Sequence, residues 1–130
     1  MDKTEVKHFT DLLAWQKGHL LLLNIYKLTE VFPKHEKYGL SSQIQRASVS
    51  ETSNIAEGYG RYFYKESIKF YYYARGSLAE IENCLIIAKD LKYINPATYE
   101  TFLSHLTECH KLLNGLINHT KNQAAKQSNN

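Results

Sequence analysis

The chain has 130 residues, of which 43% are hydrophobic and 22% are charged. These values are ordinary for one globular domain and exclude a chain that is disordered throughout. Only six glycines and two prolines are present. An all-β sandwich needs many more turn residues, so the composition favours helix. The formal net charge of +3 permits an anionic partner, but it is small for a dedicated DNA-binding domain.

Cysteine content and hydropathy bear on the compartment. Cys84 and Cys109 are too few for a disulfide scaffold, and two free thiols are typical of a reducing cytosol. The first residues contain no apolar segment of the kind found in a signal peptide, and the longest purely aliphatic run covers only residues 20–23. We therefore expect a cytoplasmic protein without a membrane contact.

The first half of the chain predicts two helices after a leader at residues 1–9. The first helix is expected at about residues 11–32, capped by Thr10 or Asp11 and ended by Pro33, with apolar residues at alternating steps of four and three. The second is expected at about residues 40–60. Its apolar stripe is weaker, because Glu51 stands where an aliphatic residue is expected.

The second half predicts two longer helices. One is expected at about residues 63–91, and the other at about 96–120, where Asn95 can cap the N terminus and Pro96 suits the first helical position. Residues 122–130 are polar and are expected to be a disordered tail. Four helices with such seams and short connections predict an all-α fold, an antiparallel up-down-up-down four-helix bundle over residues 10–121.

The chain lacks the motifs of common catalytic and metal sites. A di-iron bundle needs Glu-x-x-His on two helices, and the one such pair, Glu5 and His8, lies in the leader. His105 and Cys109 share one helix face, but zinc requires at least a third ligand. No phosphate-binding glycine loop or nucleophile motif is present. We therefore expect no catalytic residue, metal or cofactor, and no enzyme.

Residues 59–75 hold eight aromatic and four basic residues against one acid. Such a surface could track a phosphate backbone and stack on bases. An interface between chains, or a solvated helix face, fits the same composition. The candidate nucleic-acid-binding residues are Arg46, Arg61, Lys65, Lys69 and Arg75, with Tyr62, Tyr64 and Tyr72 as stacking neighbours.

A second polar stripe lies on the second predicted helix and contains Gln43, Ser50, Asn54 and Glu57. Short polar side chains are poorer helix formers than Lys or Glu, so a stripe of them favours a packed hydrogen-bonded interface over a plain solvent face. We interpret these four residues as structural, and the solvent face remains the alternative.

Apolar residues also extend beyond the bundle seams. They are Leu20, Leu23 and Tyr26 on the first helix and Tyr71, Tyr73, Ile86 and Ile87 on the third. One bundle hides an apolar stripe of only about 100° or somewhat more on each helix. We therefore expect this excess to be buried against other copies of the chain, in a heterologous contact that closes into a ring.

Several motifs resemble a known family. They are Phe9-x-Asp11-Leu12, Trp15-Gln16, Ile25-Tyr26-Lys27-Leu28-Thr29, Phe32-Pro33, Tyr38-Gly39-Leu40-Ser41-Ser42-Gln43-Ile44, Arg46-Ala47-Ser48-Val49-Ser50, Asn54-Ile55-Ala56-Glu57-Gly58, Gly60-Arg61 and Gly76-Ser77-Leu78-x-Glu80 with Glu82. Over about residues 9–119 the chain resembles the bacterial four-helix-bundle proteins encoded in 23S ribosomal RNA intervening sequences. More distantly, it is similar to the accessory variability determinant protein of diversity-generating retroelements.

The resemblance implies a homopentameric ring without known catalysis. For the retroelement relatives it also implies binding to RNA or DNA and to a reverse transcriptase. The chain departs from the family pattern in two places: Gln45 replaces a usual arginine, and the pair Glu51-Thr52 replaces an aliphatic residue followed by proline. We therefore predict a non-catalytic, ring-forming protein that binds nucleic acid through a basic surface. The alternative is an assembly or protein-interaction module that does not bind nucleic acid.

Overall fold

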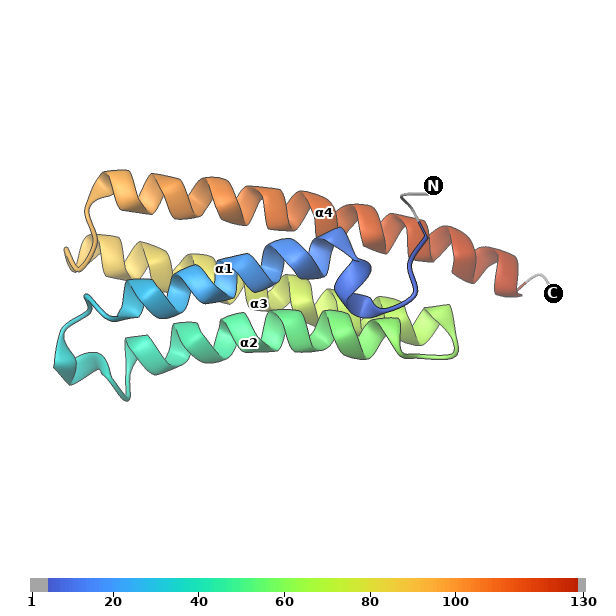
Figure 1. Cartoon of the computed structure of the whole chain (residues 1–130), viewed down its shortest axis with the longest axis horizontal. Helices are drawn as coiled ribbons and strands as arrows, with labels where there is room; N and C mark the ends of the chain where they lie inside the picture. The colour runs from blue at the N-terminus through green and yellow to red at the C-terminus, as the bar shows by residue number, and fades with distance from the viewer. Residues whose placement is uncertain (1–4, 129–130) are drawn as a thin grey trace.

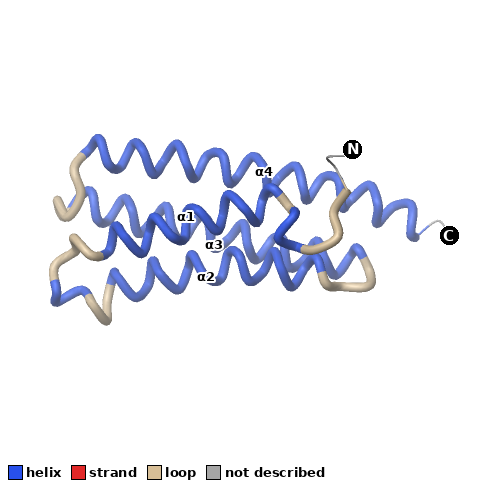
Figure 2. The backbone as a smooth tube through the Cα atoms, in the orientation of Figure 1, coloured by secondary structure: helices blue, strands red, loops and turns tan. Residues whose placement is uncertain are grey.

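The computed structural model describes residues 5–128, and its main elements are four helices. They are α1 (Leu13–Thr29), α2 (Leu40–Tyr59), α3 (Tyr64–Asp90) and α4 (Pro96–Ser128). Short 3₁₀ helices, η1 (Phe9–Asp11) and η2 (Lys34–Glu36), precede α1 and α2. Consecutive helices run in opposite directions along the long axis (Figure 1), and no strand interrupts residues 5–128 (Figure 2). The predicted all-α four-helix bundle is confirmed.

The helices occupy the corners of the bundle in chain order. α2 packs between α1 and α3, and α4 packs against α3 and α1. Within the described part of the chain, α1 and α3 do not pack against each other, so they lie diagonally. Their outward faces therefore point in different directions from the bundle.

The core is built from the heptad seams of all four helices. The large aliphatic side chains with less than 2% exposure are Leu21, Ile25, Ile44, Ile55, Leu78, Ile81, Leu85, Leu106, Leu113 and Ile117. Burying each such side chain contributes about 1.5–3 kcal/mol relative to leaving it exposed. No helix within residues 5–128 combines the length and apolar composition needed to cross a bilayer.

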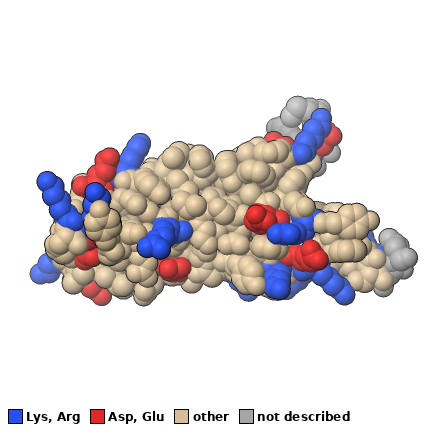
Figure 3. All heavy atoms as spheres, turned by 90° about the horizontal axis from the view of Figure 1, so that it is seen from below, with Lys and Arg blue, Asp and Glu red and all other residues tan. Residues whose placement is uncertain are grey.

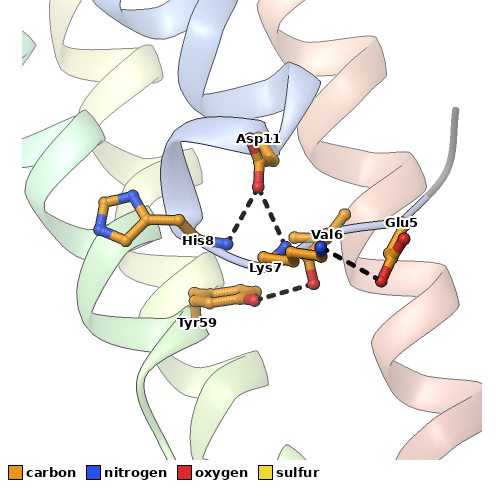
Figure 4. A network of polar contacts seen from close by, with 6 residues as sticks. All are labelled: Glu5, Val6, Lys7, His8, Asp11 and Tyr59. Atoms are coloured by element: carbon orange, nitrogen blue, oxygen red, sulfur yellow. Dashed lines mark hydrogen bonds and ion pairs between the residues drawn. The ribbon is translucent and has the colours of Figure 1, made fainter.

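The first helix is shorter than the predicted range of 11–32. Leu12 is extended, with a ψ of 127°, and separates η1 from α1. The Asp11 carboxylate accepts hydrogen bonds from the backbone N–H groups of Lys7 and His8, at 3.0 and 3.1 Å, and thereby fixes the leader (Figure 4). Asp11 thus caps η1 instead of starting α1. The part of the predicted leader at residues 1–4 lies outside the described residues.

The predicted disordered tail at residues 122–130 is wrong for residues 122–128, which continue α4. The side chain of Ala124 is buried, and the Gln127 Oε1 accepts a hydrogen bond from the Tyr64 backbone N–H at 3.1 Å. These contacts attach the last turns of α4 to the start of α3, which compensates for their polar composition. Residues 129–130 lie outside the described part of the chain.

The core contains one carboxyl group, that of Glu51 on α2. Its side chain is 1% exposed, and its Oε1 has no hydrogen-bond partner within residues 5–128. It faces Gly18 of α1, where an added Cβ would overlap the carboxyl oxygen and lie 3.0 Å from its Cδ. Burial raises the pKa of Glu51 to about 8. Burial, and secondarily Glu51, raises the pKa of Cys109 to about 12.

Tyr71 corrects one surface prediction. Sequence periodicity places it among the exposed residues, but it is 3% exposed. A Cβ at Gly58 of α2 would lie only 2.5 Å from the Cε1 of Tyr71, so the absent side chain at Gly58 makes room for this ring. Gly58 therefore lets α2 and α3 approach closely.

Candidate nucleic-acid interface

Two of the predicted cations stand on the outward face of α3. Lys65 and Lys69 are exposed and are four residues apart, which places them on adjacent turns of the same helix face. Within residues 5–128 neither lysine forms an ion pair. Their charges are therefore available to an anionic ligand.

A second pair of cations gathers around Tyr72 between α3 and α4. The Arg75 guanidinium lies 4.7 Å from the centroid of the Tyr72 ring, and the Lys121 Nζ lies 5.5 Å from the same centroid. Arg75 also donates a hydrogen bond to the Asn114 Oδ1 at 3.2 Å. Lys121 is not among the residues predicted from the sequence. Its position on α4, opposite Tyr72, depends on the pairing of two helices.

The remaining two predicted residues do not join this surface. Arg61 forms an ion pair with Glu57 at 2.7 Å and lies over the Phe70 ring, 4.3 Å from its centroid. Arg46 donates from its Nε to the Ser42 Oγ at 3.3 Å. Arg46 also lies beside Glu80 in a shallow hollow, roughly 20 Å along α2 from the end of that helix near Arg61, at 1.5 Å per residue.

Charge is mixed at the end of the molecule where α2 passes into α3. Figure 3 shows Lys and Arg side chains gathered there, with acidic side chains among them. The cationic surface is therefore defined here by four residues: Lys65, Lys69, Arg75 and Lys121. Tyr72 lies among them and remains partly exposed, so its ring is accessible to a stacking base.

Tyr62 and Tyr64, the other expected stacking residues, differ in their surroundings. Tyr62 is 81% exposed and packs edge-on against Phe63, with 4.8 Å between ring centroids. Tyr64 is half-buried at the start of α3. Only Tyr72 lies beside the cations of the cationic surface, while Tyr62 and Tyr64 belong to the end of the bundle.

The polar stripe of α2 divides into two parts. Asn54 donates to the Ser50 carbonyl at 2.9 Å and to the Ser50 Oγ at 3.1 Å, and the Ser77 hydroxyl of α3 donates to the Ser50 Oγ at 3.0 Å. Ser50 and Asn54 thus belong to a hydrogen-bonded ladder between α2 and α3. Gln43 and Glu57 are exposed and lie outside this ladder.

His105 and Cys109 gain no third metal ligand within residues 5–128. Cys109 is buried, and burial lowers the pKa of His105, which neighbours Lys17 and Glu108. Within residues 5–128, no group of three His, Cys, Asp or Glu side chains is placed to hold a metal ion.

The predicted apolar excess is exposed, apart from Tyr71. On α1 the exposed residues are Leu20, Leu23 and Tyr26, and on α3 they are Tyr73, Ile86 and Ile87. Because α1 and α3 lie at diagonal corners, these are two separate faces of the bundle. Each face combines apolar residues with the neighbouring polar surface, as partly apolar interfaces do.

These features define a small all-α bundle with an outward cationic surface and two exposed apolar faces. The chain belongs to the family of 23S rRNA-intervening sequence proteins, whose model matches residues 10–115. It is similar in structure to a protein of unknown function from the S23 ribosomal protein family of Bacteroides thetaiotaomicron VPI-5482. That similarity has a TM-score of 0.72 and 25% sequence identity, and it covers 81% of this chain and 98% of the other.

No curated protein matches the chain. The resemblance to the intervening-sequence family is confirmed by the family model and by the solved structure. The more distant similarity to the retroelement protein stays a prediction.

Proposed function

We propose that this protein is a non-catalytic, ring-forming homo-oligomer that binds RNA or DNA through the cationic surface. The observation that carries the proposal is a group of four cations that form no ion pair with a carboxylate within residues 5–128, two of them beside one accessible tyrosine ring. Lys65 and Lys69 extend along α3, while Arg75 and Lys121 flank Tyr72. Such a surface neutralises phosphates without reading base edges, so binding should be largely independent of sequence.

The apolar faces support the assembly part of the proposal. A contact between the α1 face of one copy and the α3 face of the next joins two different surfaces, and is therefore heterologous. Contacts of this kind close into rings when the rotation between copies permits it. The number five comes from the family resemblance. Five copies at +3 would carry +15, and repeated sites would strengthen weak binding by avidity.

The proposed compartment rests on the two cysteines. Cys84 and Cys109 are free thiols, buried on α3 and α4. Free buried thiols suit a reducing environment, and we place the protein in the cytoplasm on that ground.

Charge reversal tests the binding part. Changing Lys65 and Lys69 together to Glu is expected to abolish binding of labelled single-stranded and double-stranded RNA and DNA, measured by fluorescence anisotropy. Changing Lys34 and Lys37 to Glu is the matched control, because these exposed lysines lie at η2, at the other end of the bundle (Figure 1). Wild-type affinity should fall with salt, with a log–log slope of about 0.7–0.9 per phosphate contact.

A protein-interaction module without nucleic-acid binding is the second candidate. It is favoured by the acidic neighbours of two predicted cations, since Arg61 pairs with Glu57 and Arg46 lies beside Glu80. Wild-type protein that binds no strand at about 50 mM salt, where phosphate contacts are strongest, would select this candidate. A reverse transcriptase encoded by a retroelement is the partner that the distant resemblance would then suggest.

A further inference from the structure

A hollow of about 420 Å³ lies at the end of the bundle where α2 passes into α3. Its walls come from the leader, both of those helices, their connection and α4. The lining residues used below are Val6, Tyr59, Arg61, Tyr71, His119 and Gln123. Its volume falls within the range of roughly 300–1,000 Å³ that is usual for small-ligand sites. None of its described lining residues carries a carboxylate.

Tyr71 supplies an unused polar group to this hollow. Its ring is packed against Gly58, and only 3% of the residue is exposed. Its hydroxyl makes no hydrogen bond within residues 5–128. Burial, with Tyr59 and Tyr64 nearby, raises the pKa of Tyr71 to about 12, so the phenol remains a hydrogen-bond donor at neutral pH.

The leader forms one wall of the hollow. The Tyr59 hydroxyl donates to the Val6 carbonyl at 3.3 Å, and the Asp11 carboxylate holds the next two backbone N–H groups (Figure 4). These contacts hold Val6 in the wall of the hollow. An aromatic ring entering the hollow would therefore meet tyrosine rings and an apolar wall.

The rim offers groups that suit a nucleotide. The side chains of His119 and Gln123 can donate and accept hydrogen bonds, as the edges of an unpaired base require. Arg61 lies at the rim, held by Glu57 and Phe70, where its remaining donors can meet a phosphate. Lys65, the second residue of α3, begins the cationic surface four residues farther along the chain.

We infer that this hollow receives an unpaired nucleobase from a single-stranded nucleic acid whose backbone follows the cationic surface. The inference rests on the proposed function and specifies its ligand as single-stranded. A base within a duplex is stacked and paired on its Watson–Crick edge, so the hollow would discriminate against duplexes. The Tyr71 hydroxyl would donate to an exocyclic or ring acceptor of the inserted base.

The test compares a labelled oligothymidine strand with the same strand made abasic at every position. Base–aromatic stacking predicts roughly 5- to 150-fold tighter binding of the strand that carries bases. Tyr71→Phe should reduce that ratio by about 2- to 10-fold, because one hydrogen bond is lost, and should leave binding of the abasic strand unchanged. His119→Ala, at the exposed rim, should reduce the same ratio without disturbing the core. Tyr38→Phe is the control, because Tyr38 is exposed just before α2 and does not line the hollow.

Equal affinity for the two strands, or a ratio that both Tyr71→Phe and His119→Ala leave intact, would overturn the inference while leaving the proposed function in place. Failure of wild-type protein to bind any labelled single-stranded or double-stranded RNA or DNA at low salt would instead refute the proposed function, and this inference with it. Binding of duplexes without binding of the oligothymidine strand would overturn this inference alone.

Discussion

The buried carboxyl of Glu51 makes the stability of the bundle depend on pH in a predictable way. Its pKa is about 8 in the folded protein against 4.5 as an ordinary glutamate, so the folded state holds the proton more tightly. Below pH 4.5 the carboxyl is protonated in both states, so folding does not bury a charge. As the pH rises toward 8, the Glu51 carboxyl loses its proton in the unfolded state but keeps it in the folded state. The free energy of unfolding should therefore fall by roughly 4–5 kcal/mol across this window.

That loss is a large share of the free energy of unfolding of a typical domain, which is roughly 5–15 kcal/mol. Glu51→Gln keeps the size and polarity of the side chain but cannot ionise. We therefore expect the variant to match wild type near pH 5 and to be several kcal/mol more stable at pH 8. Cys109, whose pKa is raised to about 12, stays neutral throughout this range and does not obscure the effect.

Urea unfolding at intervals from pH 5 to pH 8 measures the effect, because it yields a free energy of unfolding at each pH. Glu100→Gln is the matched control, since Glu100 is an exposed glutamate on α4. It should retain the wild-type pH dependence. Parallel pH profiles for wild type and Glu51→Gln would refute the reasoning, because they would mean that the carboxyl is solvated or paired.

Three further predictions concern packing. Gly18→Ala should destabilise wild type by about 1–3 kcal/mol, because the added Cβ overlaps the Glu51 carboxyl. The same change should cost less in a Glu51→Ala background, and a double-mutant cycle of thermal melts would measure this coupling. Asn54→Ala should cost about 0.5–1.5 kcal/mol through the α2–α3 ladder, whereas Glu57→Ala, at an exposed ion pair, should cost at most about 1 kcal/mol; equal losses in chemical unfolding would contradict this difference. Ala124→Asp should release the last turns of α4, seen as faster amide exchange after residue 120; unchanged exchange would show that these turns are not held by packing.

The positions of the helices could be predicted because the capping residues and the apolar periodicity of each segment agree. Pro96 after Asn95 begins α4 where expected, and the Asn95 side chain accepts a hydrogen bond from the Thr98 N–H at 2.7 Å. The weak stripe of α2 pointed to Glu51, and this side chain is indeed enclosed in the core. These features depend on a residue and its near neighbours in the sequence, so a single sequence is sufficient to predict them.

What could not be predicted depends on pairing between helices. The polar composition after Thr120 gives no sign that Ala124 and Gln127 meet the start of α3. Likewise, Lys121 joins the candidate site only because α4 carries it beside Tyr72. Arg46 shares a basic character with Lys65 but lies well along α2, beside Glu80. Helical periodicity fixes the direction of a side chain around its own helix, but not the neighbours that it meets.

Sedimentation velocity of a labelled single-stranded RNA, with and without the protein, tests the central claim most directly because it reports assembly and binding together. At low salt the RNA should sediment with a protein species several times larger than the 15.1 kDa chain, and added salt should release the RNA while the assembly persists. RNA that sediments as free strand beside a 15.1 kDa monomer, at protein concentrations of tens of micromolar, would contradict the account.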